Sequence, residues 1–253
     1  YPLSRYYRLE GSVGYFNRSA ELPVTNPEGE LTFASYDDQA PIVSAGIVGD
    51  TTSWNNYGPH QGSRWEFRLL YGADLEDGGT LTAGGTVDYR KYFALSRRNE
   101  IAFRLWGAFA DGNRPSVFAF GGLDTVRGFP TRSIAGNEAA FVNLEWRFPL
   151  IDRLDLAFMS IGEIRGRFFA DVGYSCFTSG SVEYNYFGQP GCTFIGEKEF
   201  FNPLTGEVET TGEDGRLTDG VAAYGFGISV NIFGLPFHWD WVNRWDFEDS
   251  LGS

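Results

Sequence analysis

The stretch RWEFRLLY, residues 64–71, alternates apolar and polar side chains over most of its length. One face is apolar and the other charged: the first consists of Trp65, Phe67, Leu69 and Tyr71, and the second of Arg64, Glu66 and Arg68. Successive side chains of a β-strand point to opposite faces of the sheet, so a period of two predicts a strand. This stretch therefore predicts a β-strand with one apolar and one charged face.

The same alternation recurs along the 253 residues. Aromatic residues make up 17% of the chain and there are 33 glycines, which is typical of β-proteins with tight turns. An apolar run of about 18 residues, as a membrane-spanning helix requires, does not occur. The pattern predicts nine strands, approximately at 5–21, 40–52, 63–75, 80–95, 100–112, 137–149, 162–175, 219–233 and 236–247.

Alternating strands fit two kinds of β-protein. A soluble sandwich buries its apolar faces in one core and exposes its polar faces to water. A membrane barrel turns its apolar faces to lipid and lines its interior with charged and small residues. Both alternatives give the same period of two, so the choice depends on strand length, on charge and on the positions of the aromatic residues.

Three features favour the barrel. The predicted spans have about ten residues or more, whereas strands of globular proteins usually have about five to six and a tilted membrane span needs about 9–11. Opposite charges share the polar face of one strand, as Arg8 and Glu10 do. Aromatic residues gather at strand ends, at 89–93 and 237–247, as in the girdle at a membrane interface. We therefore expect an all-β fold, an antiparallel transmembrane β-barrel.

The connections between the predicted strands alternate between short and long. The short ones lie at 55–62, 96–99, 149–152 and 233–236, and the long ones at 22–39, 113–136 and 176–217. Outer-membrane barrels have short periplasmic turns and longer extracellular loops, so the first predicted strand runs outward. Because single-chain bacterial barrels have an even number of strands, we expect residues 1–253 to be the C-terminal portion of a larger barrel domain, without the N-terminal strands, the last strand and any periplasmic domains.

Two short motifs carry a family resemblance. Val126-Arg127-Gly128-Phe129, which follows Gly121 and Gly122, resembles the sixth extracellular loop of the bacterial surface-antigen (BamA-like) barrel superfamily. Two strands later, the residues Phe169, Asp171 and Gly173 resemble the F-x-D-x-G strand of that family. The resemblance implies about nine strands of a sixteen-stranded barrel in the bacterial cell outer membrane. Members of the superfamily include barrel-assembly insertases and two-partner secretion transporters.

The resemblance also implies a partner for Arg127. Family members fold the sixth loop back into the barrel, where its arginine reaches acidic residues on two strands. The alternation in 141–148 and 167–173 places Glu145 and Asp171 on inward faces, so the resemblance pairs Arg127 with both. A guanidinium is always charged and binds carboxylates in a bidentate manner, which suits a latch between loop and wall. The alternative is an arginine in a solvated loop without a fixed partner.

The two cysteines, Cys176 and Cys192, both lie in the long connection after the F-x-D-x-G strand. In an oxidising compartment we expect them to form a disulfide, which the loop-entropy model values at roughly 3 kcal/mol. Two buried free thiols are the alternative. A disulfide would agree with an exported protein and has no bearing on catalysis.

Other chemistry finds little support in the sequence. His60 and His238 are far apart, and no spacing of Cys, His and carboxylate residues fits a metal site. The acidic segment 206–215 lacks the spacing of a calcium loop. The net charge of −13 comes without a basic stripe, which argues against nucleic acid as a partner. We expect no enzyme, no cofactor and no metal.

Three functional hypotheses remain. The first is an insertase or translocase whose seam opens laterally to template incoming strands. The second is a conduit for a secreted polypeptide or a solute, gated by the Arg127 loop. The third is a structural anchor for a periplasmic or cell-surface assembly, without transport. The resemblance favours insertion or translocation of polypeptides, with outer-membrane lipid, an unfolded polypeptide and periplasmic or surface proteins as partners, and the anchor is the alternative.

Overall fold

The computed structural model describes most of the chain. The described residues are 1–25, 31–55, 58–75, 78–152, 154–155, 160–162, 164–178, 192–202, 207–232 and 235–247. All structural statements below refer to these residues. Within them, no helix is long and apolar enough to cross a membrane.

One large antiparallel sheet dominates the molecule. Its main path has nine strands, each paired with the next along the chain: β1 (Tyr7–Thr25), β2 (Leu31–Asp50), β4 (Gly58–Ala73), β5 (Thr80–Ala94), β6 (Glu100–Asp111), β9 (Glu138–Ile151), β12 (Ile164–Cys176), β15 (Gly220–Ile232) and β16 (Leu235–Trp245). Each of the nine expected spans overlaps one of these strands. The expectation of an all-β antiparallel fold is confirmed.

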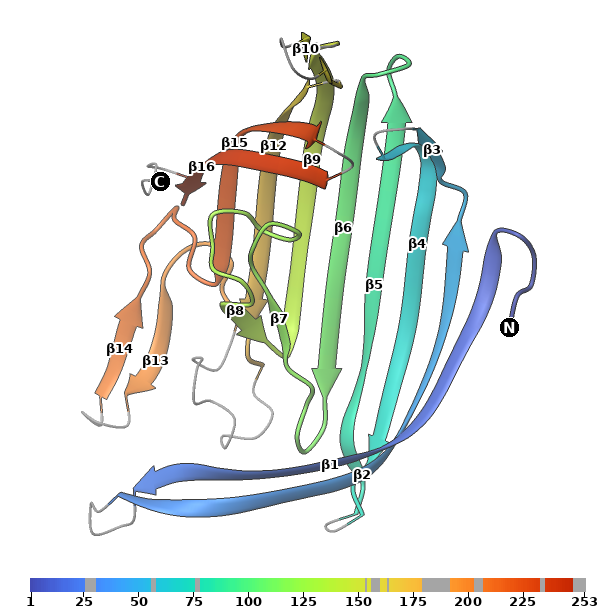
Figure 1. Ribbon diagram of the computed structural model, residues 1–253. Coiled ribbons are helices and arrows are strands. Elements are labelled where there is room, and N and C mark those ends of the chain that lie inside the picture. The colour runs from blue at the N-terminus through green and yellow to red at the C-terminus, as the bar shows by residue number, and fades with distance from the viewer. Residues whose placement is uncertain are drawn as a thin grey trace.

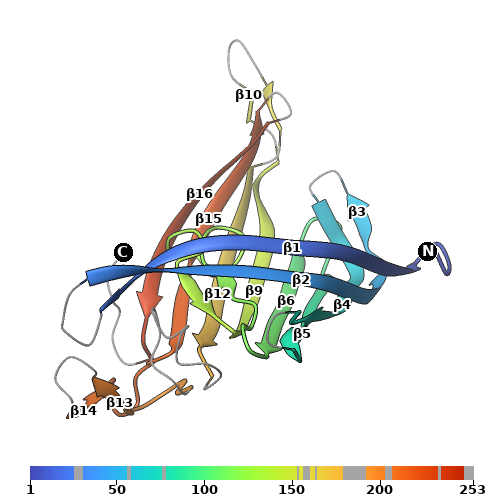
Figure 2. The same cartoon turned by 90° about the horizontal axis from the view of Figure 1, so that it is seen from below.

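The sheet is curved and open (Figure 1). Strands β1 and β16 form its two edges, and they are not paired with each other among the described residues. The far halves of β1 and β2 bend away from the sheet and run across its lower end (Figures 1 and 2). The main strands thus enclose a concave side onto which the connections can fold.

The long loop expected at 22–39 is wrong. Strand β1 continues to Thr25 and pairs with β2 from Leu31 onward, so most of this segment is a two-stranded ribbon. Strand β2 pairs with β4 only from Ile42 to Asp50. Among the described residues, no third strand pairs with the ribbon beyond that point, so the ladder of backbone hydrogen bonds between β1 and β2 alone defines it. The alternation of apolar and polar residues could not predict this ribbon, because it reveals a strand only where the strand has one apolar and one polar face.

Two of the expected short turns are also wrong. At 55–62, most residues belong to β4, whose first residues pair with β3 (Ser53–Asn55). At 149–152, β9 continues to Ile151, and the connection to β12 contains the small pair β10 (Leu154–Asp155) and β11 (Ser160–Ile161). The first segment pairs as a short ribbon beside the main sheet. At the second, β9 itself is longer than its alternation indicates, because Ile151 still pairs with Ile164 of β12.

The connection at 113–136 folds onto the concave face of the sheet (Figure 1). Its ends form the pair β7 (Phe118–Phe120) and β8 (Ile134–Gly136). A cluster of buried apolar residues joins it to the sheet, consisting of Phe120 and Val126 from the connection and Ala139 and Phe141 from β9. The hydrophobic core thus lies between a loop and the inner wall of the sheet.

The connection at 176–217 takes a different path. It contains the hairpin of β13 (Lys198–Asn202) and β14 (Glu207–Thr211), which lies below and to the side of the main sheet in Figure 1. Residues Ile195 and Leu217 form an isolated bridge near the base of this hairpin. The two long connections leave β6 and β12, on either side of β9, one folding inward and the other projecting outward.

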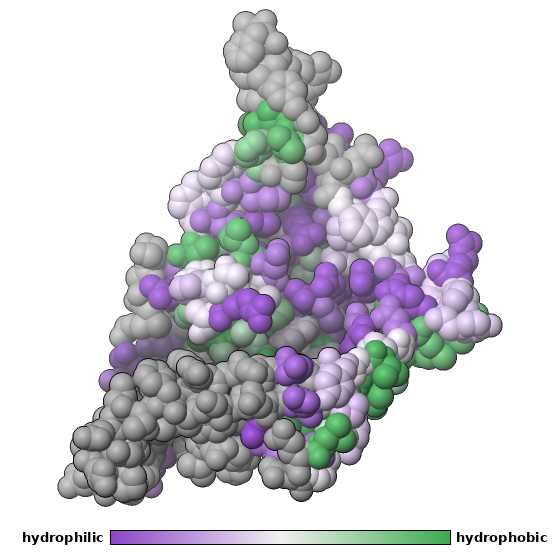
Figure 3. All heavy atoms as spheres, turned by 60° about the horizontal axis from the view of Figure 1, so that its bottom comes forward, coloured by the Kyte–Doolittle hydropathy of each residue, from purple (hydrophilic) through white to green (hydrophobic). Residues whose placement is uncertain are grey.

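The convex face of the sheet is apolar. Large hydrophobic side chains on it remain 38–58% exposed: Val43, Phe67, Leu69, Tyr71, Val87, Leu105, Phe109, Leu144, Trp146, Phe168, Tyr224, Trp239 and Trp241. Aromatic rings touch across four adjacent strands, with centroids 6.0 Å apart for Trp146 and Phe168 and 5.3 Å for Phe168 and Phe226. Hydrophilic residues gather instead in the hollow of the sheet (Figure 3). A soluble sandwich would bury such a surface, and this sheet leaves it uncovered.

Candidate functional site

The site is built by the turn that carries Arg127. The hydroxyl of Thr125 accepts a hydrogen bond from the backbone N–H of Gly121 (2.8 Å), and the N–H of Gly122 donates to the carbonyl of Val126 (3.2 Å). These bonds close the turn on itself, so that it presents the next side chain to the sheet. Val126 is completely buried and Arg127 is only 2% exposed.

The guanidinium of Arg127 binds the carboxylate of Asp171 on β12. Its Nε donates to Oδ2 and its Nη2 to Oδ1, both at 2.7 Å, and the backbone N–H of Arg127 adds a third bond to Oδ2 at 3.1 Å. Asp171 is 0% exposed. Two parallel charge-assisted bonds of this kind fix orientation as well as distance. The arrangement anchors both the side chain and the backbone of the loop to one strand.

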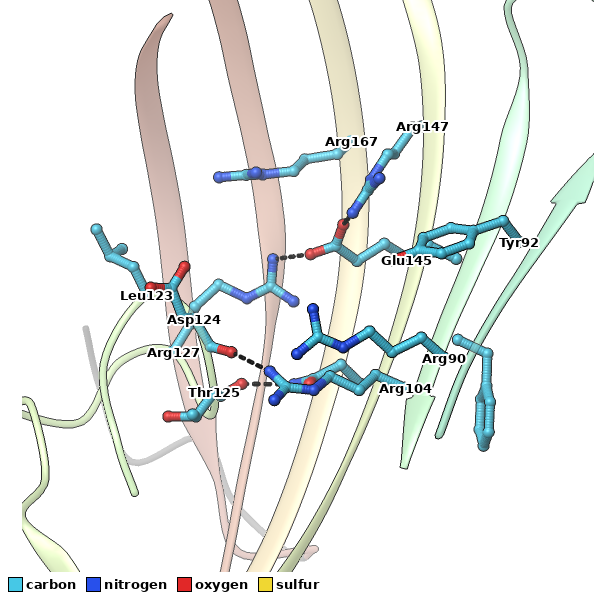
Figure 4. Close-up of a pocket in the computed structure, with 13 residues that line it drawn as sticks. Arg90, Tyr92, Arg104, Leu123, Asp124, Thr125, Arg127, Glu145, Arg147 and Arg167 are labelled. Carbon is cyan, nitrogen blue, oxygen red and sulfur yellow. Dashed lines mark hydrogen bonds and ion pairs between the residues drawn. The ribbon is translucent and has the colours of Figure 1, made fainter. Parts of the chain in front are cut away.

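A second carboxylate completes the surroundings of Arg127. Its Nη1 donates to Oε1 of Glu145 on β9 at 2.5 Å, while Arg147 donates to the other oxygen, Oε2, at 2.6–2.7 Å (Figure 4). Glu145 therefore bridges the loop arginine and a wall arginine. Because Glu145 and Asp171 lie on neighbouring strands, Arg127 holds the loop to both.

Asn143 was not singled out as a site residue from the sequence, and it lies at the centre of the site. Its amide donates to Oδ1 of Asp171 (2.8 Å) and to the backbone carbonyl of Thr125 (2.5 Å). It thus binds the same carboxylate as Arg127 and the turn next to it. Its inward position follows from the alternation along 141–148. Its contact with the turn depends on the path of the loop, which no sequence pattern specified.

Aromatic and small residues pack around the charges. The guanidinium carbon of Arg127 lies 3.7 Å from the centroid of the Phe169 ring, a stacked contact that favours arginine over lysine. A Cβ atom at Gly173 would lie 2.7 Å from the Phe120 ring and 3.0 Å from Val126. Glycine is therefore required on the strand because the loop core passes directly over it.

The residues after Arg127 lie against β16. Gly128 has a φ of +86°, a conformation that costs glycine little, and a Cβ there would lie 2.9 Å from Val242. Phe129 is half-buried, with the guanidinium of Arg244 5.7 Å from its ring centroid. All eight residues of the two motifs and the paired glutamate therefore lie in one region between loop and sheet.

The charge state of Arg127 follows from its surroundings. Burial alone lowers the pKa of its guanidinium, but the hydrogen bond to Asp171 and the charges of Glu145 and Asp171 outweigh burial and raise the pKa above its usual value. The arginine therefore stays charged throughout the range in which the protein would fold. Removing one partner of such a buried pair costs more than the pair itself contributes, because it leaves the other charge uncompensated.

The cysteines lie apart from this site. Cys176 and Cys192 form a disulfide with a Cα–Cα distance of 5.4 Å. Glu138 is close to both sulfur atoms, and these three residues are a geometrically possible metal group. Since both sulfurs are bonded to each other, neither is a thiolate that could bind a metal.

The two histidines make no common site. His60 lies on β4, where its Nδ1 is 2.8 Å from Oε2 of the buried Glu100, and His238 lies on β16. In the acidic segment 206–215, residue 206 lies outside the described residues, and Glu207–Thr211 is strand β14. The described part of this segment is therefore a hairpin strand and the turn after it.

Comparison with known proteins gives a fold relationship. No protein-family model and no curated protein sequence matches the chain. Among solved structures, the fold resembles part of a BamA barrel. The crystal structure of BamA from Haemophilus ducreyi lacking POTRA domains 1-3 matches with a TM-score of 0.65 and 14% sequence identity, covering 100% of this chain and 49% of that one. The chain thus spans about half the length of the structure it resembles, and at this identity the likeness concerns the fold.

Proposed function

We propose that this chain is part of an outer-membrane β-barrel that inserts polypeptides into the bacterial outer membrane or translocates them across it, without being an enzyme. The observation that carries the proposal is the connection 113–136, bound inside a BamA-like sheet by the buried contact of Arg127 with Asp171 and Glu145. A loop held within the concave side is positioned to control what passes there. The proposed partners are outer-membrane lipid, an unfolded polypeptide, and periplasmic or surface proteins.

The distribution of apolar residues supports a membrane location. The convex face exposes aromatic and aliphatic side chains over most of its strands, and the concave face carries arginines and carboxylates. This matches a barrel with its apolar face toward lipid and a wet interior. In a bilayer, unpaired backbone groups at β1 and β16 would each cost several kcal/mol. We therefore propose that further strands pair with both edges to close a barrel of sixteen.

The role proposed for the Arg127 loop is that of a latch. Its contacts are polar and reversible, so that a competing ligand or a movement of β9 relative to β12 could release it. The apolar contacts of Phe120 and Val126 return it to the same position. A latch of this kind would couple the interior of the barrel to the wall formed by β9 and β12.

The membrane orientation can be tested by tryptophan fluorescence. Single-tryptophan variants that keep Trp146 or Trp241, both exposed on the convex face, are expected to be quenched by brominated lipids in reconstituted vesicles. Trp106, whose ring stacks on the inward Phe141 at 5.2 Å, is the matched control and should not be quenched. Equal quenching of Trp106 and Trp241 would refute the proposed orientation.

The activity needs a separate assay on the full-length protein. Proteoliposomes that contain it are expected to accelerate the insertion of an unfolded outer-membrane polypeptide, and Arg127→Ala should abolish the acceleration. Ala170→Ser on β12, on the face opposite to that of Asp171, is the control. A wild-type protein that does not accelerate insertion, but that purifies from native membranes in a stable periplasmic or surface assembly, would favour the structural anchor over the insertase.

A further inference from the structure

Two adjoining cavities on the concave face are lined by arginine. The first, of about 480 Å³, is lined by Arg90, Arg104, Arg127, Arg147 and Arg167. The second, of about 200 Å³, is lined by Arg147, Arg165 and Arg167, together with Gly166, Ser229 and His238. Because they share Arg147 and Arg167, the cavities are contiguous. We call the six arginines the arginine tract, and Figure 4 shows Arg90, Arg127, Arg147 and Arg167 directed toward a common space.

The carboxylates that hold Arg90 and Arg167 leave part of each guanidinium available, whereas all three side-chain nitrogens of Arg104 and Arg127 already donate hydrogen bonds. Arg90 uses Nε and Nη2 on Asp88 (3.0 and 2.8 Å), and Arg167 uses Nε and Nη2 on Asp240 (3.0 and 2.5 Å). A guanidinium has five N–H donors in a planar fork. In both residues the carboxylate occupies one edge of the fork, so Nη1 is not engaged by that carboxylate.

The balance of charge in the cavities favours an anion. Arg104 also binds Asp88, so that Arg90 and Arg104 share one carboxylate. Glu145 is in turn shared by Arg127 and Arg147. The first cavity contains Glu145 and Asp124 beside five arginines, and the residues described as lining the second include no carboxylate. Asp240 and the buried Glu100, whose Oε1 lies 3.7 Å from Nη1 of Arg147 and 3.4 Å from Nη2 of Arg165, bind these arginines from outside the two linings. Guanidinium groups therefore outnumber carboxylates only among the residues that line the cavities.

We propose that the arginine tract binds a phosphate-type oxyanion between Arg147 and Arg167. Arginine forks match the geometry of phosphate oxygens and bind them through paired hydrogen bonds. Ser229 and His238 supply further polar groups in the second cavity. The arginines are fixed in place beforehand by Glu145 and Asp240, which reduces the entropy lost when an anion binds. This inference concerns a binding site and holds whether or not the chain transports polypeptides.

The test is isothermal titration of the full chain in detergent with inorganic phosphate, against chloride at matched ionic strength. The wild type is expected to bind phosphate and not chloride. The double variant Arg167→Gln/Asp240→Asn removes both members of an ion pair and leaves no unpaired charge. It should weaken phosphate binding about ten-fold or more, and each factor of ten corresponds to about 1.4 kcal/mol. Arg8→Gln/Glu10→Gln removes a pair on β1 outside the tract and should leave the affinity unchanged.

Arg90→Gln is a second variant with little risk to folding, because Asp88 keeps its bonds to Arg104. It should weaken phosphate binding about three-fold, because one charged donor at the edge of the site is lost. The proposal is overturned if phosphate gives no more heat than chloride, or if the tract variants bind it as tightly as Arg8→Gln/Glu10→Gln. Neither result would alter the lipid quenching of Trp241, so this failure is distinct from a failure of the membrane proposal.

Discussion

The two long connections of the molecule are restrained by opposite means. The connection at 113–136 folds inward and is held by a buried ion pair, with Arg127 2% and Asp171 0% exposed. The connection at 176–217 projects outward and is held by the disulfide Cys176–Cys192, with Ile195 46% exposed. The first connection ends at β9 and the second begins at the neighbouring strand β12, and the two differ in the chemistry of the side chains they carry.

The ends of the two connections are joined by Asn137. Asn137, 1% exposed, donates to the carbonyl of Ala110 (2.8 Å) and to the hydroxyl of Thr178 (2.6 Å), and its own side-chain oxygen accepts from the N–H of Thr178 (2.8 Å). A charged interior can thus retain a loop by non-covalent pairing that remains reversible. A loop beyond the sheet, which lacks such a wall, is retained by a covalent bond.

The largest effect is expected from Arg127→Ala. It leaves the buried Asp171 with Asn143 as its remaining side-chain partner, and loss of one member of a buried ion pair costs about 3–5 kcal/mol. We expect residues 113–136 to become sensitive to proteinase K and the temperature of unfolding to fall. Arg127→Lys should recover part of the loss, since lysine keeps the charge without the fork. Ala170→Ser is the neutral control, and unchanged proteolysis of Arg127→Ala would exclude the latch.

The second effect, in order of size, concerns the outward connection. Cys176→Ser/Cys192→Ser opens a covalent loop with a sequence separation of 16, for which the entropy model gives about 3 kcal/mol. Proteolysis within 192–217 should increase, while 113–136 stays protected, because its ion pairs are intact. Equal loss of protection in both connections would show that they are coupled through Asn137, and the comparison would then break down.

Much of the fold could be predicted because each main strand has one apolar and one polar face. In β12, for example, Phe168 and Ala170 are exposed while Phe169 and Asp171 are buried, as the alternation requires. The segments that the alternation does not predict are the described parts of 22–39 in β1 and β2, of 55–62 where β4 begins beside β3, and of 149–152 where β9 continues along β12. Their strands depend on pairing with one neighbour, and no side-chain pattern reports it.

In the candidate site, likewise, the positions of the strand residues could be predicted and the packing of the loop could not. Alternation places Asn143, Glu145 and Asp171 on inward faces, and the family motif supplies Arg127 as the group that meets them. The turn hydrogen bonds of Thr125 and the contact of Phe120 with Gly173 depend on the course of 24 connecting residues (113–136), which local sequence does not determine. The long-range packing of the loop is therefore the part of the site that the sequence does not predict.

Gly173→Ala should have a smaller effect that is confined to the inward loop. Its Cβ would lie 2.7 Å from the Phe120 ring, which is 2% exposed and has no room to yield, and overpacking of this kind costs about 1–3 kcal/mol. Gly14→Ala is the matched control, since a Cβ there has no atom within 4 Å. Proteolysis at 113–136 should rise only in Gly173→Ala, and equal stability of the two variants would contradict the close packing of loop on strand.

The smallest effect is expected from Glu145→Gln. Glutamine can still accept a hydrogen bond from Arg127, which also keeps both of its bonds to Asp171, so the loss is that of one charge and should be about 1 kcal/mol. The unfolding temperature of Glu145→Gln should therefore lie between those of wild type and Arg127→Ala. In a double-mutant cycle, Glu145→Gln should cost less in the Arg127→Ala background than in the wild type, because its partner is already gone. Additive losses would mean that Glu145 acts through Arg147 alone, and the inward loop would then be held by a single strand.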